Sequence, residues 1–414
     1  MERRGSIESA TLRHPSATGS VGIVSTHSRK LPGPLHLDGG AVLEPVTIAY
    51  ETYGNLNPAR DNAILVCHAL SGDAHAAGWS DVEDSPSAVD GIGADERGIK
   101  ARGGLGWWDN LIGPGKAFDT NRYFVVSTNL LGSCRGSTGP VSLNPTTGRP
   151  YGTDFPVITV GDMVRAEHAL LSELGIDRLL AVAGGSLGGM QALEWSIAFP
   201  QDVCCVVMTA STARLSAQGV AWNAIARNAI MTDPDWQGGQ YYGTGRNPTG
   251  GVGIARMVGH VTYLSAMSMN EKFGRRLQSG NSLSFTLSEP DFAVESYLRH
   301  QAATFAERFD ANSYLYLSRA LTYFDAARTY GDGSLASALD RTAASFLLLS
   351  FSSDWLYPSR DSYEIQESLE AAGKEVQHHV IDTNYGHDSF LLEDVHQTRL
   401  ISSFLDQTYR RLPT

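Results

Sequence analysis

A single pentapeptide constrains the fold of this chain more than any other feature. Residues 184–188 read Gly-Gly-Ser-Leu-Gly, which matches the pattern G-x-S-x-G. An apolar run at 179–183 precedes them and indicates a buried strand, while 190–195 has the composition of a helix. A serine between a strand and a helix is the arrangement of the nucleophile elbow, in which glycines let the two elements approach closely around a strained serine. We therefore predict that Ser186 is a catalytic nucleophile.

A nucleophilic serine in this arrangement needs an acid and then a histidine later in the chain. Asp354 lies just beyond the apolar run 344–351, which predicts a buried strand, and His387 follows the strand-like run 376–381. Open α/β sheets place their sites beyond the carboxyl ends of the strands, so all three groups are expected on one edge. Taken singly, the aspartate is explained as well by a helix cap and the histidine by an ordinary loop position. Together with Ser186, in this order at three strand ends, they predict a Ser-His-Asp triad.

The order of the predicted elements indicates an α/β-hydrolase fold, with a mostly parallel, doubly wound sheet and an inserted helical lid. Further strands are expected at 46–53, 63–69, 123–129 and 204–210, and helices of the core at 161–174 and about 393–410. Helical segments without a strand between them are expected at 220–231, 254–264, 294–309 and 314–330. We therefore predict a loose N-terminal segment at 1–30, a core of 31–211 and 331–414, and a helical lid at 212–330. Residues 80–106 are interpreted as a surface loop.

Composition excludes several classes of partner. The chain has 414 residues and a net charge of −12, which argues against nucleic acid and against an anionic membrane surface. An anionic substrate would therefore need a local basic pocket. The four cysteines show no spacing typical of a metal site, and no stretch is long and apolar enough to span a bilayer. With no signal-like N-terminus, these features predict a cytoplasmic enzyme without a bound metal.

Several longer motifs carry a resemblance to a known family. The chain is similar to the homoserine O-acetyltransferases from about residue 43 to residue 405, through both lid and core. The similarity lies in His-Ala-Leu-Ser-Gly-Asp-Ala-His at 68–75, Gly-Trp-Trp-Asp at 106–109, Ile-Gly-Pro-Gly-Lys at 112–116, Gly-Ser-Thr-Gly-Pro at 136–140, the elbow region 184–195, and Tyr-Gly-His-Asp at 385–388. Motifs as long and unusual as these do not arise by chance.

This resemblance implies acyl transfer from acetyl-CoA, used as a co-substrate, to the hydroxyl of L-homoserine, an early step toward methionine. No bound cofactor is implied. His387 would take the proton of Ser186, with Asp354 orienting the imidazole, and the acyl-serine enzyme would then wait for homoserine in a ping-pong scheme. The backbone N–H groups of Leu70 and Leu187 would hold the oxyanion. Members of the family also resemble one another in forming homodimers, for which the lid helices offer an interface.

The acceptor brings two charges of its own, and the resemblance assigns a partner to each. A zwitterion bound near a dry site needs a cation for its carboxylate and an anion for its ammonium group. Arg256 matches the family position for the carboxylate, and Asp388 matches the position for the amino group. From the residues alone, the simpler explanations are a surface arginine on a helix and a turn or cap aspartate.

Other reactions on the same framework stay open. Succinyl-type members of the family have a basic residue two positions past the acid, whereas this chain has Leu356, which favours an acetyl donor. The stretch Leu-Gly-Ser-Cys at 131–134 looks more like relatives that acylate serine. The alternatives are therefore a succinyl-CoA-dependent homoserine or serine O-acyltransferase, or a serine esterase. A dehalogenase would need a carboxylate in place of Ser186.

Overall fold

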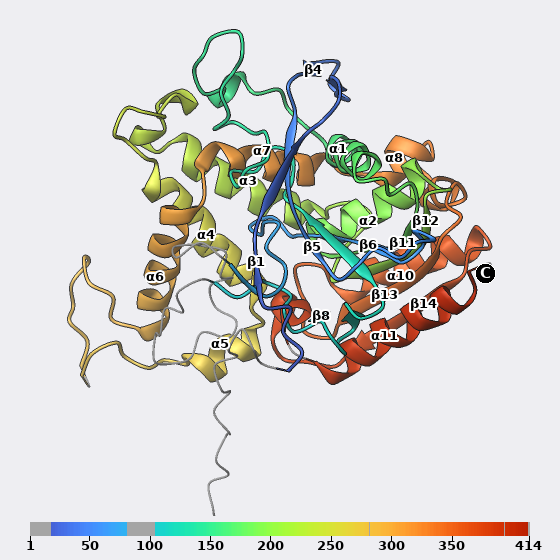
Figure 1. Ribbon diagram of the computed structural model, residues 1–414. Coiled ribbons are helices and arrows are strands. Elements are labelled where there is room, and N and C mark those ends of the chain that lie inside the picture. Colours follow the sequence, from blue (N-terminus) through green and yellow to red (C-terminus); the bar gives the residue numbers. More distant parts are fainter. Residues whose placement is uncertain (1–17, 81–103, 281, 393, 413–414) are drawn as a thin grey trace, which may run out of the picture.

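The computed structural model describes residues 18–80, 104–280, 282–392 and 394–412. Its centre is an eight-stranded sheet with the strand order β14-β13-β12-β11-β6-β10-β5-β2 (Figure 1). The six strands from β14 to β10 run parallel, and β5 and β2 are antiparallel at one edge. The sheet strands are β2 (His27–Lys30), β5 (Thr47–Tyr53), β6 (Ala63–Cys67), β10 (Phe124–Thr128), β11 (Leu179–Gly185), β12 (Val203–Thr209), β13 (Ser345–Phe351) and β14 (Val376–Ile381).

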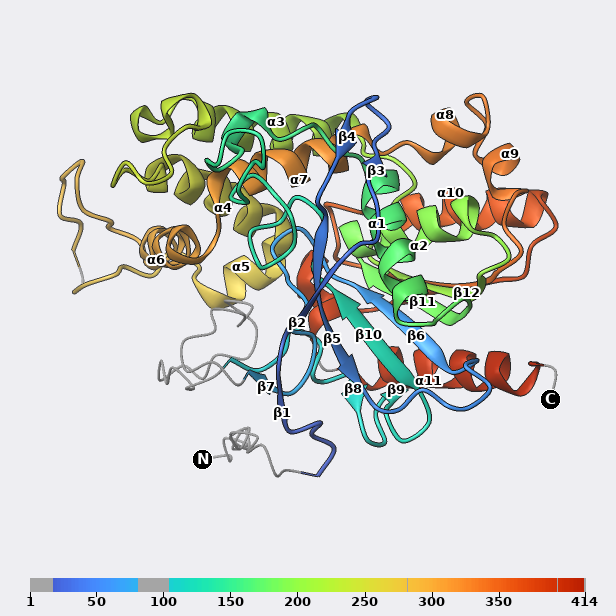
Figure 2. The same cartoon turned by 45° about the horizontal axis from the view of Figure 1, so that its top comes forward.

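The central strands are apolar because both faces of the sheet are covered. Along β6, Ala63, Leu65 and Cys67 pack into one hydrophobic cluster, while Ile64 and Val66 pack into a second cluster on the other face. The first face is covered by α1 (Val160–Glu173), α2 (Leu187–Ala198) and α10 (Ser359–Ala371), and the second by α11 (Val395–Arg410) (Figure 2). This mostly parallel sheet between helices confirms the predicted fold class.

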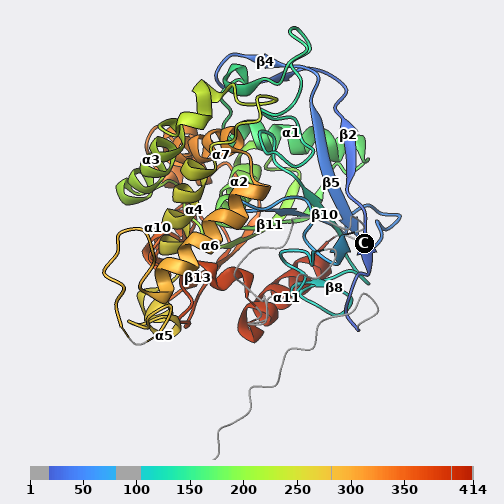
Figure 3. The ribbon, with the colours of Figure 1, turned by 90° about the vertical axis from the view of Figure 1, so that its left-hand side faces the viewer.

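A block of helices joins β12 to the later part of the core. It contains α3 (Ala217–Met231), α4 (Thr249–Tyr263), α5 (Ala266–Lys272), α6 (Ala293–Arg308) and α7 (Ala311–Tyr323). Figure 3 shows α3, α4, α6 and α7 gathered together beside the sheet. The helix predicted at 314–330 is in fact two helices, because Phe324 is extended and the Asp325 carboxylate caps α8 (Ala326–Tyr330) through the N–H of Arg328.

The N-terminal expectation is wrong for its last residues. β1 (Ile23–Val24) pairs with β7 (Trp79–Ser80), and β2 pairs with β5, so residues 23–24 and 27–30 form strands rather than a loose segment. The sequence of β2 is His-Ser-Arg-Lys and all four side chains are exposed, so an edge strand held by backbone hydrogen bonds leaves no hydrophobic pattern to detect. Residues 1–17, 393 and most of the predicted loop at 80–106 lie outside the described residues.

The remaining elements are short. They are β3 (Leu35–His36), β4 (Val42–Leu43), β8 (Ile112–Gly113), β9 (Phe118–Asp119), α9 (Leu335–Leu339) and the 3₁₀ helices η1 (Gly152–Asp154), η2 (Pro234–Gly239) and η3 (Gly386–Leu391). Within the part of the chain that the structure describes, no helix combines the length and the apolar character needed to cross a membrane.

Candidate active site

Ser186 lies on the turn between β11 and α2. Its backbone has φ 57° and ψ −122°, a conformation that a residue with a β-carbon rarely adopts. The neighbouring glycines are required by contact: a Cβ on Gly188 would lie 2.0 Å from the carbonyl oxygen of Cys67. A Cβ on Gly184 would lie 2.4 Å from the backbone of Gly188. The strand–serine–helix arrangement predicted from the pentapeptide is therefore present, with the serine held at the carboxyl end of β11.

Asp354 and His387 meet at the same edge of the sheet, beyond β13 and β14. The imidazole Nδ1 lies 2.8 Å from Oδ2 of the aspartate. Oδ1 of Asp354 accepts the backbone N–H groups of Leu356 and Tyr357, both at 3.0 Å. With one oxygen bound by two amides, the carboxylate can present only the other oxygen to the histidine. The exposed fractions of Ser186, Asp354 and His387 are 8%, 4% and 3%, so this edge is largely dry.

Three aromatic rings surround the imidazole of His387. The ring centroids of Tyr357, Phe390 and Tyr263 lie 5.0, 5.5 and 5.9 Å from that of the histidine. Burial raises the pKa of Tyr357 well above its usual value. Sequence reasoning missed these rings. The available signals were the position of Tyr357 in the loop after Asp354, and that of Tyr263 two helical turns from Arg256.

The loop after β6 carries the N–H of Leu70. The imidazole of His68 fixes this loop: Nε2 accepts the N–H of Leu130 at 3.1 Å, and Nδ1 lies 2.7 Å from the carbonyl oxygen of Ala69. Burial lowers the pKa of His68, which keeps the ring neutral. Leu187 is the first residue of α2, where N–H groups have no partner within the helix. Among the described residues, neither leucine N–H donates a hydrogen bond to another backbone group outside helices and strands.

A second buried hydrogen-bond network, centred on Glu51, holds the same loop. The Glu51 carboxylate accepts the Tyr53 hydroxyl at 2.8 Å and the Thr26 hydroxyl at 2.7 Å, and its Oε2 lies 3.0 Å from Nδ1 of His75. Burial lowers the pKa of His75, but the hydrogen bond and charge of Glu51 outweigh it and the net direction is upward. The backbone N–H of His75 in turn donates to Asp73 at 2.9 Å. The network therefore fixes residues 73–75 of the loop.

Arg256 reaches this edge from α4, in the inserted helices. It is 4% exposed, which excludes the simpler explanation of a surface arginine. Its guanidinium lies 4.7 Å from the ring centroid of Phe305 and 6.0 Å from that of Tyr263, and Nη1 lies 3.5 Å from the hydroxyl of Ser71. Within the described part of the chain, Nε of Arg256 has no hydrogen-bond partner. A buried cation with a donor to spare can bind an anionic group of a ligand.

Asp388 follows the histidine directly and supplies the opposite charge. Burial raises the pKa of its carboxyl group, while the nearby positive charges of His387 and Arg256 act in the opposite direction. The pKa of Tyr263 is raised by burial, lowered by the charge of Arg256 and raised by that of Asp388, so this ring lies near both. The structure therefore brings the two predicted acceptor contacts to one place beside His387.

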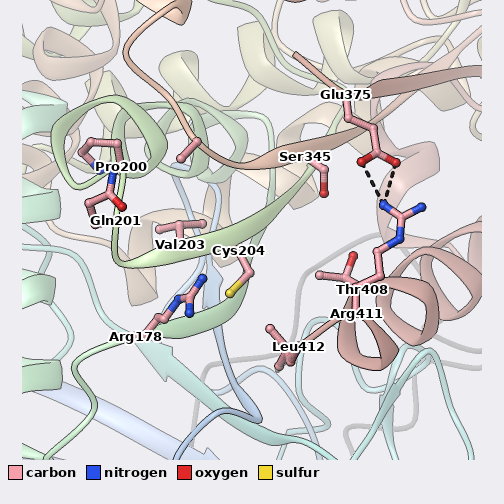
Figure 4. A pocket seen from close by; sticks show the side chains of 11 residues that line it. Arg178, Pro200, Gln201, Val203, Cys204, Ser345, Glu375, Thr408, Arg411 and Leu412 are labelled. Atoms are coloured by element: carbon pink, nitrogen blue, oxygen red, sulfur yellow. Dashed lines mark hydrogen bonds and ion pairs between the residues drawn. The ribbon is translucent and has the colours of Figure 1, made fainter. Parts of the chain in front are cut away.

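A separate pocket of about 270 Å³ lies at the opposite end of the strands. Arg178 precedes β11, Cys204 is the second residue of β12, and Glu375 precedes β14, so the pocket is at the amino edge of the sheet. Glu375 forms an ion pair with Arg411 at 2.8 Å across it (Figure 4). The three predicted triad residues are all at the carboxyl edge, where open α/β sheets hold their sites. No group of three metal-ligating side chains is found in the described ranges.

Comparisons with known proteins agree with this geometry. A family model described as the alpha/beta hydrolase fold matches residues 62–394. A homoserine O-acetyltransferase of Methanohalobium evestigatum is 49% identical over 94% of this chain and 75% of that protein. A crystal structure of homoserine O-acetyltransferase from Bacillus anthracis shares 31% identity with a TM-score of 0.81, covering 93% of this chain and 98% of that one. Esterase E22 is as similar, with 31% identity and a TM-score of 0.81 over 92% and 100%. The chain belongs to the homoserine O-acetyltransferase family of the α/β-hydrolase fold.

Proposed function

We propose that this enzyme transfers the acetyl group of acetyl-CoA to the hydroxyl of L-homoserine through an acetyl-Ser186 intermediate. The observation that carries the proposal is the placement of one buried cation and one carboxylate, Arg256 and Asp388, beside the Asp354–His387 pair. Acyl transfer by itself requires only the triad, whereas the binding of a zwitterionic acceptor also requires these two charges. The product, O-acetylhomoserine, would serve methionine biosynthesis in the cytoplasm.

In the first half-reaction, His387 removes the proton of Ser186 while Oγ attacks the thioester carbonyl. Asp354 holds the imidazole in the correct tautomer and stabilises its cation without taking the proton. The N–H groups of Leu70 and Leu187 bind the oxyanion of the tetrahedral intermediate. As this intermediate collapses, the carbon–sulfur bond breaks and the imidazolium protonates the sulfur, so free CoA leaves and the acetyl group stays on the serine.

In the second half-reaction, homoserine replaces CoA. Its carboxylate binds the guanidinium of Arg256 and its ammonium group binds Asp388, which places its hydroxyl next to His387. The histidine takes the hydroxyl proton as the oxygen attacks the acetyl-enzyme, then returns a proton to Oγ of Ser186. A water molecule has no charged groups that could bind Arg256 and Asp388. The same machinery without a charged acceptor would be an esterase, and the similarity to esterase E22 keeps that as the second candidate.

The acyl donor is proposed to be acetyl-CoA rather than succinyl-CoA. Leu356 is partly buried against the main hydrophobic cluster, and its backbone N–H donates to Asp354. A neutral side chain there offers no partner for a succinyl carboxylate. Leu356→Arg should therefore raise the preference for succinyl-CoA, and one well-made ion pair corresponds to roughly a 5- to 150-fold change in the ratio of kcat/KM values. A wild-type enzyme that already prefers succinyl-CoA would contradict the proposed donor.

The decisive experiment separates the two half-reactions. The wild-type enzyme is mixed with acetyl-CoA alone, and intact-mass spectrometry should show one added acetyl group that is absent from Ser186→Ala. Acetyl-CoA and succinyl-CoA are then each offered with homoserine and with serine. We expect the fastest product formation from acetyl-CoA and homoserine, and little acetate when homoserine is absent. Rapid acetate release without an acceptor would favour the esterase, and a ternary-complex kinetic pattern without acetyl-enzyme would exclude the ping-pong scheme.

A further inference from the structure

The Gly-Trp-Trp-Asp motif at 106–109 bonds to two separate loops of the candidate active site. The indole N–H of Trp107 donates to the carbonyl oxygen of Asp73 at 2.9 Å, in the loop after β6 that carries an oxyanion donor. The indole N–H of Trp108 donates to the carbonyl oxygen of Phe390 at 2.9 Å, in the 3₁₀ helix η3 that also carries the histidine of the triad. Two adjacent tryptophans therefore hold the loop of the base and the loop of an oxyanion donor.

The ring of Phe390 connects Trp108 to the reacting groups. Its centroid lies 6.4 Å from that of Trp108, with the planes at 81°, and 5.5 Å from that of His387. A Cβ on Gly185, the residue before the nucleophile, would lie 2.3 Å from the same phenyl ring. The indole thus fixes both the carbonyl and the ring of Phe390, and that ring packs on the base and on the nucleophile elbow.

The tryptophan pair is itself rigidly held. The two indole rings stack with centroids 5.1 Å apart and 28° between their planes, and the two residues are 7% and 0% exposed. The backbone N–H groups of Trp107 and Trp108 donate to the carbonyl oxygens of His75 at 3.2 Å and Ala76 at 2.8 Å. A Cβ on Gly106 would lie 2.2 Å from a backbone nitrogen of the same loop, so glycine is required for this close approach. Side chains locked in this way can set the distance between two loops.

We propose that Trp107 and Trp108 are positioning residues, which bridge the two loops and set the place of His387 relative to the oxyanion donor. The inference rests on the proposed function only in taking Ser186 as the nucleophile, with His387 as its base. Acylation requires the imidazole to reach the serine oxygen while the oxyanion donor faces the carbonyl of the substrate, and a misplacement of about 1 Å can cost roughly 100-fold in rate. The indoles take part in no bond making, and they act through the loops.

A bridge differs from two independent attachments in how the loss of its parts combines. If either indole hydrogen bond is removed, the loops are no longer joined through the tryptophan pair, and removal of the second bond adds little. Two independent attachments would instead give effects on the rate that multiply. The double replacement therefore distinguishes a bridge from two local contacts.

The test replaces the indole N–H with sulfur by placing 3-benzothienylalanine at position 107, at position 108, or at both. This side chain keeps the shape of the indole and removes the hydrogen-bond donor. The burst of p-nitrophenol from p-nitrophenyl acetate reports acylation of the serine without any CoA site. We expect each single replacement, and also the double one, to slow the burst about 10-fold at full amplitude. In the acetyl-CoA reaction kcat should fall while the KM for homoserine changes little.

Trp195 is the matched control, because its buried indole N–H donates to Glu167 at 2.8 Å, between α2 and α1. The same replacement at position 195 also removes one buried hydrogen bond, so it should lower the melting temperature and leave the burst unchanged. A purely structural role of Trp107 and Trp108 would give this same result. A slower burst from fully folded enzyme at 25 °C is therefore the signature of positioning.

A burst within twofold of the wild type at either position 107 or position 108 would overturn the inference. Equal slowing at position 195, or an effect of about 100-fold for the double replacement, would also overturn it. If the replaced proteins do not fold, Asn110→Ala takes their place, since the partly buried Asn110 donates from the same segment to the carbonyl of Leu392 at 2.9 Å. We then expect a burst about threefold slower, and an unchanged one would overturn the inference.

The ester keeps this inference apart from the proposed function. An enzyme that reacts with p-nitrophenyl acetate but not with acetyl-CoA would refute the proposed function, and the comparison of the bursts would still decide the role of the tryptophan pair.

Discussion

The two carboxylate oxygens of Asp354 have separate partners. Oδ1 accepts two backbone N–H groups, from Leu356 and Tyr357, and Oδ2 faces Nδ1 of His387 at 2.8 Å. Because the amides can only donate, they determine which atom of a replacement side chain takes the Oδ1 position. An asparagine would place its carbonyl oxygen there and turn its NH₂ group toward the histidine. This single residue therefore sets the tautomer of the imidazole.

Asp354→Asn should keep the fold and lose nearly all activity. The asparagine NH₂ would force Nδ1 of His387 to accept, which leaves Nε2 protonated and unable to take the serine proton. We expect kcat to fall by about four orders of magnitude, as for the wrong tautomer in serine proteases. Asp382→Asn is the control: Asp382 follows β14, is exposed, and accepts the Ser352 hydroxyl at 2.7 Å. The control should keep its activity. Near-normal activity of Asp354→Asn together with loss of activity in Asp382→Asn would show that Asp354 is not the catalytic acid.

Arg256→Ala and Asp388→Ala should each spare the release of CoA and impair transfer to homoserine. Either change leaves one end of a buried zwitterion unpaired, at a cost of roughly 2–5 kcal/mol. Stopped-flow measurement of CoA release reports the first half-reaction, and product formation reports the second. Arg299→Ala, an exposed arginine on α6 that bonds the Ser288 carbonyl, is the matched control. If both variants lost the CoA burst as completely as Ser186→Ala, the two residues would belong to the catalytic machinery instead of acceptor recognition.

At the scale of elements, a buried carboxylate joins two helices to the sheet. Glu167 on α1 accepts the Thr128 hydroxyl of β10 and the indole N–H of Trp195 on α2, both at 2.8 Å. Burial raises its pKa to about 7, and the two hydrogen bonds only partly oppose this. The folded chain therefore holds a proton that the unfolded chain releases at lower pH. Ionisation of Glu167 above neutral pH works against the packing of these three elements.

Glu167→Gln should reduce the pH dependence of stability. A carboxyl whose pKa is raised by folding stabilises the protein most at acidic pH, and this contribution is lost as the pH rises through about 7. Between the usual pKa near 4.5 and the folded value, the loss amounts to at most roughly 3 kcal/mol. Urea unfolding at pH 5.5 and pH 8 measures it: the wild type should lose more free energy of unfolding between these pH values than the variant. Equal losses would show that Glu167 is not the group responsible.

The elements differ in how far sequence could predict them. The strands of the sheet interior were predictable to within two residues at each end because burial on both faces makes them continuous apolar runs, as in β6 and β13. β2 was not, since its four side chains are all exposed. Ser186, Asp354 and His387 each follow a predictable strand, so their convergence could be inferred. The contacts of Ser71 and Tyr357 depend on how two loops and the lid pack, and no periodicity encodes that.

At the scale of the whole molecule, the inserted helices are attached to the core next to the histidine loop. The indole N–H of Trp355 donates to the carbonyl of Leu264 at 3.0 Å, and the Ser265 hydroxyl donates to the carbonyl of Asn384. A Cβ on Gly386 would lie 2.5 Å from the backbone nitrogen of Ser265, so the loop and the α4–α5 corner are in direct contact. The inserted helices also carry exposed apolar side chains, among them Ile225 and Ile254, each 49% exposed.

These exposed side chains motivate the prediction of a homodimer. Ile225 lies on α3 and Ile254 on α4, two helices that pack against each other, and exposed apolar side chains can mark an interface. Sedimentation velocity at micromolar concentration should give twice the mass of the chain. Ile225→Asp and Ile254→Asp should shift the equilibrium to monomer, whereas Ile23→Asp, at a position on β1 that is 65% exposed, should not. A wild type that stays monomeric at every concentration tested would contradict the dimer.

The close packing around Ser186 also determines which sequences this chain can explore. Gly184 and Gly188 touch backbone atoms rather than flexible side chains, so no neighbouring substitution can make room for a Cβ. In a library of single substitutions, almost no replacement of the elbow residues should leave an active enzyme. In the neighbouring helix α2, exchanges between apolar residues of similar volume should be tolerated. Variation that changes the substrate must enter elsewhere, through the loop after Asp354 or the lid residues near Arg256. The residues that determine substrate specificity and those that carry out catalysis can therefore evolve at different rates within one protein.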